Sequence, residues 1–207
     1  MATHLTPTLF NFDPLAIIMT ILIIFIAIVV SSFAMRYLKG DSQYNKFFLY
    51  ISLLVAFLIG MVSADNLFIL LMAWGLCNSM LILLMKHKSA WQAAKASSIL
   101  TTKIYLLGFV FITTGCCLLY TATGESSIKL IVQHNTESPM IVCGLLFLVL
   151  GAMTESAIWP FHKWLLSSLN APTPVSAIMH AGLVNGGGFL LARFAPLYCN
   201  APQILTI

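Results

Sequence analysis

Six runs of apolar residues, each close to the length of a membrane-spanning helix, follow one another along the chain. A helix that crosses the hydrocarbon core of a bilayer needs about 20 mostly apolar residues at ~1.5 Å of rise each. The second and third runs lie so close together that Asp65 and Asn66 are expected to form a tight turn at the membrane surface. The pattern predicts spans at residues 15–35, 47–64, 66–85, 99–120, 140–169 (broken near 160) and 174–194.

The composition supports a membrane environment. Of the 207 residues, 60% are hydrophobic and only 8% are charged, whereas soluble domains carry about 25% charged residues. Such a chain cannot build a water-facing surface, which excludes an ordinary soluble enzyme, a disordered tail and a disulfide-stapled secreted domain. We predict an all-α integral membrane protein with about six transmembrane helices, forming one transmembrane domain over residues 1–207.

The basic residues are distributed unequally between the two sides of the predicted spans. The net charge is +4, and the basic residues lie between apolar runs, which favours membrane orientation over nucleic-acid binding. Lys129 and Arg193 fall on one side, and seven basic residues fall on the other. The side with seven is predicted to be cytoplasmic, and both termini extracytoplasmic, in the inner (plasma) membrane; the seven are Arg36, Lys39, Lys46, Lys86, Lys88, Lys95 and Lys163.

Motifs for covalent chemistry are missing from the sequence. The five cysteines show neither CxxC pairing nor histidines at zinc-site spacing, and there is no nucleotide loop, flavin motif, iron–sulfur set or nucleophile–base arrangement. We therefore expect no cofactor, no metal site and no covalent catalysis from this chain alone.

Three ionisable residues within the predicted spans are candidates for an ion pathway: Lys103, Glu155 and His180. A charged side chain at the bilayer centre costs at least about 2.5–3.5 kcal/mol on insertion scales, so such residues face a protein interior or a hydrated path. Glu155 lies deep in the fifth span, close to the helix break expected at Pro160. A carboxylate beside a broken helix favours proton or ion handling; the alternative is a structural ion pair with Lys103.

The neighbouring polar residues also leave alternatives open. His180 suits a proton relay but is equally consistent with a hydrogen-bonded core histidine. His162 and Lys163 are consistent with interface anchoring beside Trp164 or with proton entry from the cytoplasm.

Prolines and glycines mark the sixth span. Pro172 and Pro174 predict a rigid turn that opens its helix. The consecutive Gly186, Gly187 and Gly188 favour close approach of another backbone, with local unwinding as the alternative.

Several motifs resemble a known family. Trp159-Pro-Phe-His-Lys-Trp-Leu, followed by Ala171-Pro-Thr-Pro-Val-Ser-Ala-Ile-Met-His-Ala, is similar to the antiporter-like membrane subunits of respiratory complex I and Mrp antiporters, and Ala64-Asp-Asn-Leu and Gly75-Leu-Cys support the likeness. The resemblance implies a five-helix repeat around a broken helix that forms a half-channel, of which this chain contains the first copy. The second repeat is then expected on a separate polypeptide or in a longer protein of which this is a fragment.

The resemblance also implies a proton path through a glutamate, a lysine and a histidine or lysine. Met72 falls where the glutamate is expected, Glu155 where the lysine is expected, and His180 matches the histidine; Lys103 falls where an arginine often lies. These departures, with the run from His180 to Arg193, resemble the membrane subunit of DAB inorganic-carbon accumulation complexes. That branch implies a large zinc-bearing cytoplasmic partner.

Three functions follow as hypotheses. The first is a proton- or sodium-conducting subunit that couples a cation gradient to inorganic-carbon uptake. The second is a subunit of a respiratory NADH-quinone oxidoreductase or of an Mrp-type antiporter, with other antiporter-like subunits as partners. The third is a non-conducting membrane anchor.

Overall fold

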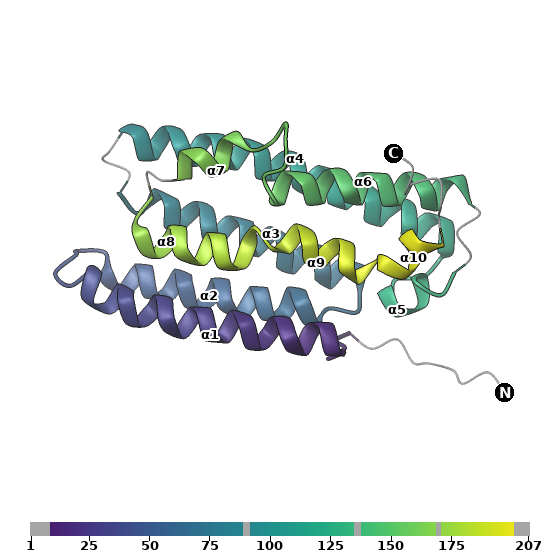
Figure 1. Cartoon of the computed structure of the whole chain (residues 1–207), viewed down its shortest axis with the longest axis horizontal. Coiled ribbons are helices and arrows are strands. Elements are labelled where there is room, and N and C mark those ends of the chain that lie inside the picture. The colour runs from purple at the N-terminus through teal and green to yellow at the C-terminus, as the bar shows by residue number, and fades with distance from the viewer. Residues whose placement is uncertain (1–8, 89–91, 135–137, 169–170, 201–207) are drawn as a thin grey trace.

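The protein is a bundle of long, roughly antiparallel helices, seen in a computed structural model that describes residues 9–88, 92–134, 138–168 and 171–200 (Figure 1). Within these residues the regular structure is helical, which confirms the all-α prediction. The elements are α1 (Pro14–Tyr37), α2 (Tyr44–Ser63), α3 (Leu67–Met85), η1 (Lys86–Lys88), α4 (Gln92–Thr123), α5 (Ile128–Ile131), α6 (Pro139–Glu155), α7 (Lys163–Ser167), α8 (Thr173–Ile178), η3 (Met179–Leu183), α9 (Gly186–Arg193) and α10 (Ala195–Cys199).

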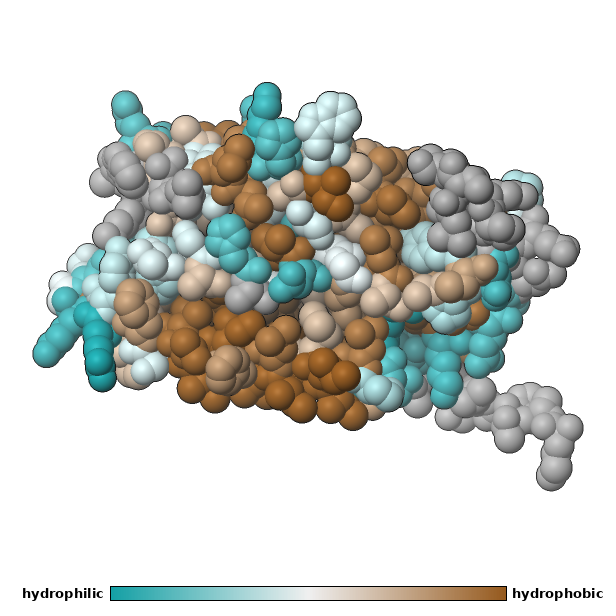
Figure 2. Space-filling view, viewed as in Figure 1, coloured by the Kyte–Doolittle hydropathy of each residue, from teal (hydrophilic) through white to brown (hydrophobic). Residues whose placement is uncertain are grey.

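Four of these helices, α1 to α4, are long and apolar enough to cross a membrane, and α6 is a shorter apolar helix. Large apolar side chains on α1 point outward, including Ile21 and Phe25. In Figure 2 hydrophilic residues gather at the two ends of the bundle and apolar ones dominate the lower half between them, while a few hydrophilic residues lie in the middle of the upper half. This distribution fits a surrounding solvent of lipid.

Local capping explains where the first spans begin. Asp13 accepts a hydrogen bond from the Ala16 amide through Oδ1 at 2.8 Å, with a proline in the first turn of α1. Asn66 caps α3 in the same way. The tight turn predicted between α2 and α3 is present. The Asp65 side chain in it is buried, because Ser127 Oγ and the Lys129 backbone amide donate hydrogen bonds to its carboxylate.

Glycines allow α4 and α6 to pack with their backbones close together. A Cβ added to Gly115 would lie 2.9 Å from the Gly144 carbonyl oxygen, and one added to Gly151 would lie 2.4 Å from Ile112 Cγ1. Contacts this short leave no room for a methyl group, so α4 and α6 depend on these positions for their approach.

The fifth span is interrupted earlier than the sequence predicts. Helix α6 ends at Glu155, five residues before Pro160. Ala157 adopts φ = 52°, and the amides of Ala157 and Ile158 donate to the carbonyls of Thr154 and Met153. This pair of bonds is a Schellman cap, a motif in which glycine usually takes the left-handed position. Pro160 lies in the connection to α7 and is not the residue that ends the helix.

The sixth span is also interrupted. Pro172 precedes α8 and Pro174 lies in its first turn, after which the chain forms the π-helical turn η3 and resumes as α9 at Gly186. Gly187 packs closely, since an added Cβ would lie 2.4 Å from the Ala152 carbonyl oxygen; an added Cβ at Gly188 would meet nothing within 4 Å. Gly187 therefore shows the close backbone approach that was predicted. The irregular turn η3 lies just before the three glycines, which themselves begin the regular helix α9.

Replacing Gly115 by alanine is expected to lower the free energy of unfolding by about 1–3 kcal/mol, because the new methyl overpacks the contact between α4 and α6. The matched control is Gly60→Ala in α2, where an added Cβ would meet nothing within 4 Å. That change is expected to stabilise the helix by about 0.5–1 kcal/mol. Thermal unfolding in detergent measures both; equal effects of the two variants would contradict the packing account.

Candidate functional site

The candidate site is centred on Glu155, the last residue of α6. Its side chain is only 1% exposed. Helix α6 starts at one end of the bundle (Figure 1), so sixteen steps along it place Glu155 about 24 Å from Pro139. Because this distance is shorter than the hydrocarbon layer, which is about 30 Å thick, the carboxyl group falls within the membrane-crossing length of the bundle.

Two neutral donors hold the carboxylate. Trp74 Nε1 donates to Glu155 Oε1 at 3.0 Å, and Asn78 Nδ2 donates to the same oxygen at 2.9 Å. The two donors are four residues apart on α3 and therefore share one helix face. Burial disfavours the charged carboxylate whereas the two hydrogen bonds favour it, so the site can hold Glu155 without a neighbouring cation.

Space beside Glu155 is small. A void of about 10 Å³ adjoins Glu155, Trp74, Asn78 and Cys77, close to the smallest volume that can hold a single water molecule. On another side α4 comes close at Gly108, where an added Cβ would lie 3.6 Å from Glu155 Oε1. The carboxyl group is therefore enclosed by α3, α4 and the end of α6.

The helix break beside Glu155 has its polar groups satisfied by side chains. Trp164 Nε1 donates to the Thr154 carbonyl oxygen at 3.0 Å, and Ser156 Oγ donates to the Val184 carbonyl oxygen at 2.9 Å. The second bond joins the end of α6 to the irregular stretch between α8 and α9. Two interrupted helices thus meet next to the buried acid, an arrangement tolerated at membrane depth only inside protein.

The predicted ion pair between Glu155 and Lys103 is not present. Lys103 is exposed on α4, and the ion pairs of the described residues are His87 with Asp41 and Arg193 with Asp13. The helical rotation of α4 explains the difference, because Gly108 rather than Lys103 faces the acid.

The other predicted pathway residues lie apart from the carboxylate. His180 is exposed within η3, Lys163 is exposed at the start of α7, and His162 is half-buried with a buried Nδ1 that has no hydrogen-bond partner among the described residues. Within the described chain, the side chains that hydrogen-bond Glu155 are those of Trp74 and Asn78.

Those two residues were missed by sequence reasoning. Asn78 carried a usable signal, because it is an amide within an apolar run, and such a group needs a partner. Trp74 carried none, since tryptophan is common in membrane helices.

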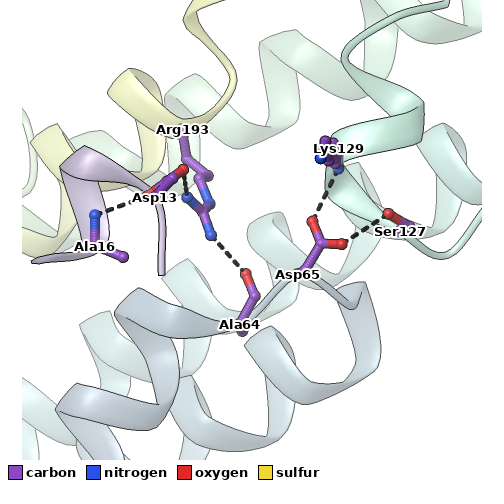
Figure 3. A network of polar contacts seen from close by, with 7 residues as sticks. All are labelled: Asp13, Ala16, Ala64, Asp65, Ser127, Lys129 and Arg193. Carbon is purple, nitrogen blue, oxygen red and sulfur yellow. Dashed lines mark hydrogen bonds and ion pairs between the residues drawn. The ribbon is translucent and has the colours of Figure 1, made fainter. Parts of the chain in front are cut away.

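A second polar cluster (Figure 3) lies where α1 begins, at the end of the bundle opposite the α1–α2 turn (Figure 1). Arg193, on α9, forms an ion pair with Asp13 and donates through Nη2 to the Ala64 carbonyl oxygen at 2.9 Å. Asp65 accepts from Ser127 Oγ at 2.9 Å and from the Lys129 amide at 3.0 Å. Arg193 and Asp13 pair their charges, and Asp65 is held by hydrogen bonds from the segment after α4, so this cluster acts as a clamp between helix ends.

Comparison with known proteins agrees with the fold. The family described as NADH:quinone oxidoreductase/Mrp antiporter, TM, matches residues 64–207, and that described as NADH-Ubiquinone oxidoreductase (complex I), chain 5 N-terminus, matches residues 5–48. The chain belongs to this family of antiporter-like membrane subunits and is a multi-pass membrane protein.

Individual relatives refine the comparison. The chain is 36% identical to the probable inorganic carbon transporter subunit DabB of Bacillus subtilis (strain 168), over 91% of this chain and 38% of the relative. It is 33% identical to the Na(+)/H(+) antiporter subunit A1 of Staphylococcus aureus (strain JH9), over 90% and 24%. The solved Mrp complex from Dietzia sp. DQ12-45-1b matches with a TM-score of 0.83 and 28% identity, over 88% and 20%. The chain thus spans well under half the length of these relatives.

Glu155 can be replaced in two ways that separate its hydrogen bonds from its charge. Glu155→Gln keeps an acceptor oxygen for Trp74 and Asn78, so the free energy of unfolding is expected to change by less than about 1 kcal/mol. Glu155→Leu leaves two buried donors unpaired, at about 1–3 kcal/mol each. Thermal unfolding in detergent compares the two variants. Equal free energies of unfolding for Glu155→Leu and Glu155→Gln would contradict the hydrogen bonds from Trp74 and Asn78.

The clamp is tested by a double-mutant cycle on Arg193 and Asp13. Asp13→Asn keeps the helix cap, since asparagine caps as well as aspartate, and removes the charge and the oxygen that accepts from Arg193. Arg193→Met is expected to cost about 1–3 kcal/mol, because the Ala64 carbonyl oxygen loses its donor and Asp13 loses its partner, and to cost less when combined with Asp13→Asn. Additive effects on unfolding would show that the pair is not coupled.

Proposed function

We propose that this chain is the proton- or sodium-conducting part of a membrane subunit that couples a cation gradient to inorganic-carbon uptake. The observation that carries the proposal is Glu155: a carboxyl group inside the membrane, beside a broken helix, held by neutral donors. The likeness to DabB supports carbon uptake as the coupled process.

The chemistry proposed for Glu155 is reversible cation loading. A proton binds the carboxylate in one step of the transport cycle and leaves it in another. In the alternative, a sodium ion binds the carboxylate instead of the proton. Because Trp74 and Asn78 are neutral and both reach Oε1, the negative charge is not already balanced by a fixed cation. A mobile cation is therefore favoured at this carboxylate.

The remaining pathway residues are assigned by position. His162, with its unpartnered Nδ1, and Lys163 lie just after the break and would supply protons from the cytoplasm. His180, in the interruption of the sixth span, would pass protons onward. Lys103 would adjust the electrostatic potential at Glu155 without forming an ion pair with it. These roles rest on the half-channel around a broken helix that the resemblance to antiporter-like subunits implies.

The assembly and orientation form part of the same proposal. The chain acts as one transmembrane domain of the inner (plasma) membrane, with its seven-residue basic side cytoplasmic and both termini outside. On that cytoplasmic side it would contact a large zinc-bearing subunit, and within the membrane other antiporter-like segments.

A second candidate function is cation/proton exchange of the Mrp type. The 33% identity to a Na(+)/H(+) antiporter subunit and the fold shared with the Mrp complex favour it. The same carboxylate would then exchange sodium for protons, without a carbon substrate.

The proposal predicts that Glu155→Gln, made in the native host, abolishes growth at ambient carbon dioxide, because the carboxylate can no longer be loaded. Growth at elevated carbon dioxide should be normal, and the partner should still co-purify. Glu125→Gln, outside the long spans, is the matched control and should grow normally. Normal growth of Glu155→Gln at ambient carbon dioxide would overturn the proposal, and loss of salt tolerance instead would favour the Mrp-type function.

A further inference from the structure

A groove of about 460 Å³ follows the outer surface between α3 and α4. Most of its lining is apolar, and Met72 in it is exposed. The hydroxyls of Ser79 and Thr102 donate to carbonyls of their own helices, and the unpartnered oxygens of Asn78 and Tyr105 are buried. A polar ligand would find few partners on this surface, so the groove is suited to a hydrocarbon chain.

The groove is about as long as one leaflet of a bilayer is thick. Its lining on α3 runs from Leu71 to Ile82, which is about 16 Å of helical rise. Half of a hydrocarbon core is about 15 Å thick. An acyl chain that lies along the two helices would therefore occupy the groove over most of its length.

Lysines continue both walls of the groove beyond Ile82. Lys86, the C-cap of α3, lies seven residues after Ser79, and Lys95 on α4 lies seven residues before Thr102. Seven residues make about two helical turns, so each lysine lies on the helix face that lines the groove. The short helix η1, which begins at Lys86, packs against α4. The two lysines therefore lie at the same end of the groove, the end of the bundle with the α1–α2 turn (Figure 1).

The charges of these lysines are not balanced within the part of the chain that the structure describes. Lys86 and Lys95 are exposed, and neither contributes to the ion pairs found there. Asp41, an acid at the same end of the bundle, already pairs with His87. Basic side chains at a membrane surface attract anionic lipids, so an anionic head group is the complement that this end of the groove favours.

We propose that the groove between α3 and α4 binds one anionic phospholipid, with an acyl chain along the groove and the phosphate between Lys86 and Lys95. The apolar lining selects the chain. The two ammonium groups select a head group of net negative charge over a zwitterionic one, whose own cation they repel. The site is separate from Glu155 and does not depend on the proposed function.

The head group is tested by native mass spectrometry of the full chain, titrated in detergent with phosphatidylglycerol or phosphatidylcholine of identical acyl chains. The unaltered protein is expected to bind the first phosphatidylglycerol at least about tenfold more tightly than phosphatidylcholine. Lys86→Gln with Lys95→Gln should bring this ratio close to one. The charge-matched control is Lys39→Gln with Lys46→Gln, two exposed lysines at the same end but outside the groove lining, and it should keep the preference. Equal affinity of the unaltered protein for the two lipids, or an equal loss in both double variants, would overturn the proposal.

The acyl chain is tested by filling the groove. Ser79→Trp is expected to weaken phosphatidylglycerol binding at least about tenfold, whereas Ile21→Trp, at a position 64% exposed on α1, should leave it unchanged. Thermal unfolding in detergent checks both variants, and Ser79→Leu replaces Ser79→Trp if the latter does not fold. Unchanged binding in the folded variant would show that the chain does not lie in the groove. Displacement of the lipid by equimolar glycerol phosphate, which has no acyl chain, would show a site for a free anion and would also overturn the proposal.

Discussion

The hydrogen bonds from Trp74 and Asn78 to one oxygen of Glu155 are the interaction on which the rest of the structure depends. A carboxylate inside a membrane needs partners, and here they come from α3 alone. The end of α6 brings Glu155 to these donors, and α4 passes close by at Gly108. The helix break and the close approach of α4 thus lie next to the same acid.

The two polar clusters of the bundle use charge in opposite ways. Arg193 and Asp13 neutralise each other and tie helix ends together, a fixed pair suited to stability. Glu155 has no cation among its described hydrogen-bond partners, so its charge remains available to a mobile ion. The paired charges lie at the end of the bundle opposite the α1–α2 turn, whereas the carboxyl group held by neutral donors lies where α6 ends.

Much of the fold could be predicted because the bilayer imposes a simple rule on length and polarity. The apolar runs located the helices, and an acid in such a run identified Glu155. The end of α6 could not be predicted, because its cap uses Ala157 at the position where glycine is the usual signal. Pro160 instead predicted a break five residues after the observed helix end. The pairing with Lys103 was wrong because sequence spacing does not fix how far α4 is rotated relative to α6. The hydrogen bonds from Trp74 and Asn78 to Glu155 could not be predicted for the same reason, because they depend on how the helices pack.

The central claim is that Glu155 gains and loses a cation inside the membrane. Infrared difference spectra of the reconstituted protein, recorded while the pH is changed, measure this directly through the carboxyl stretching band. The account predicts a band from a protonated, buried carboxyl group that appears on acidification and is missing in Glu155→Gln. A spectrum identical in the two proteins across the whole pH range would contradict it.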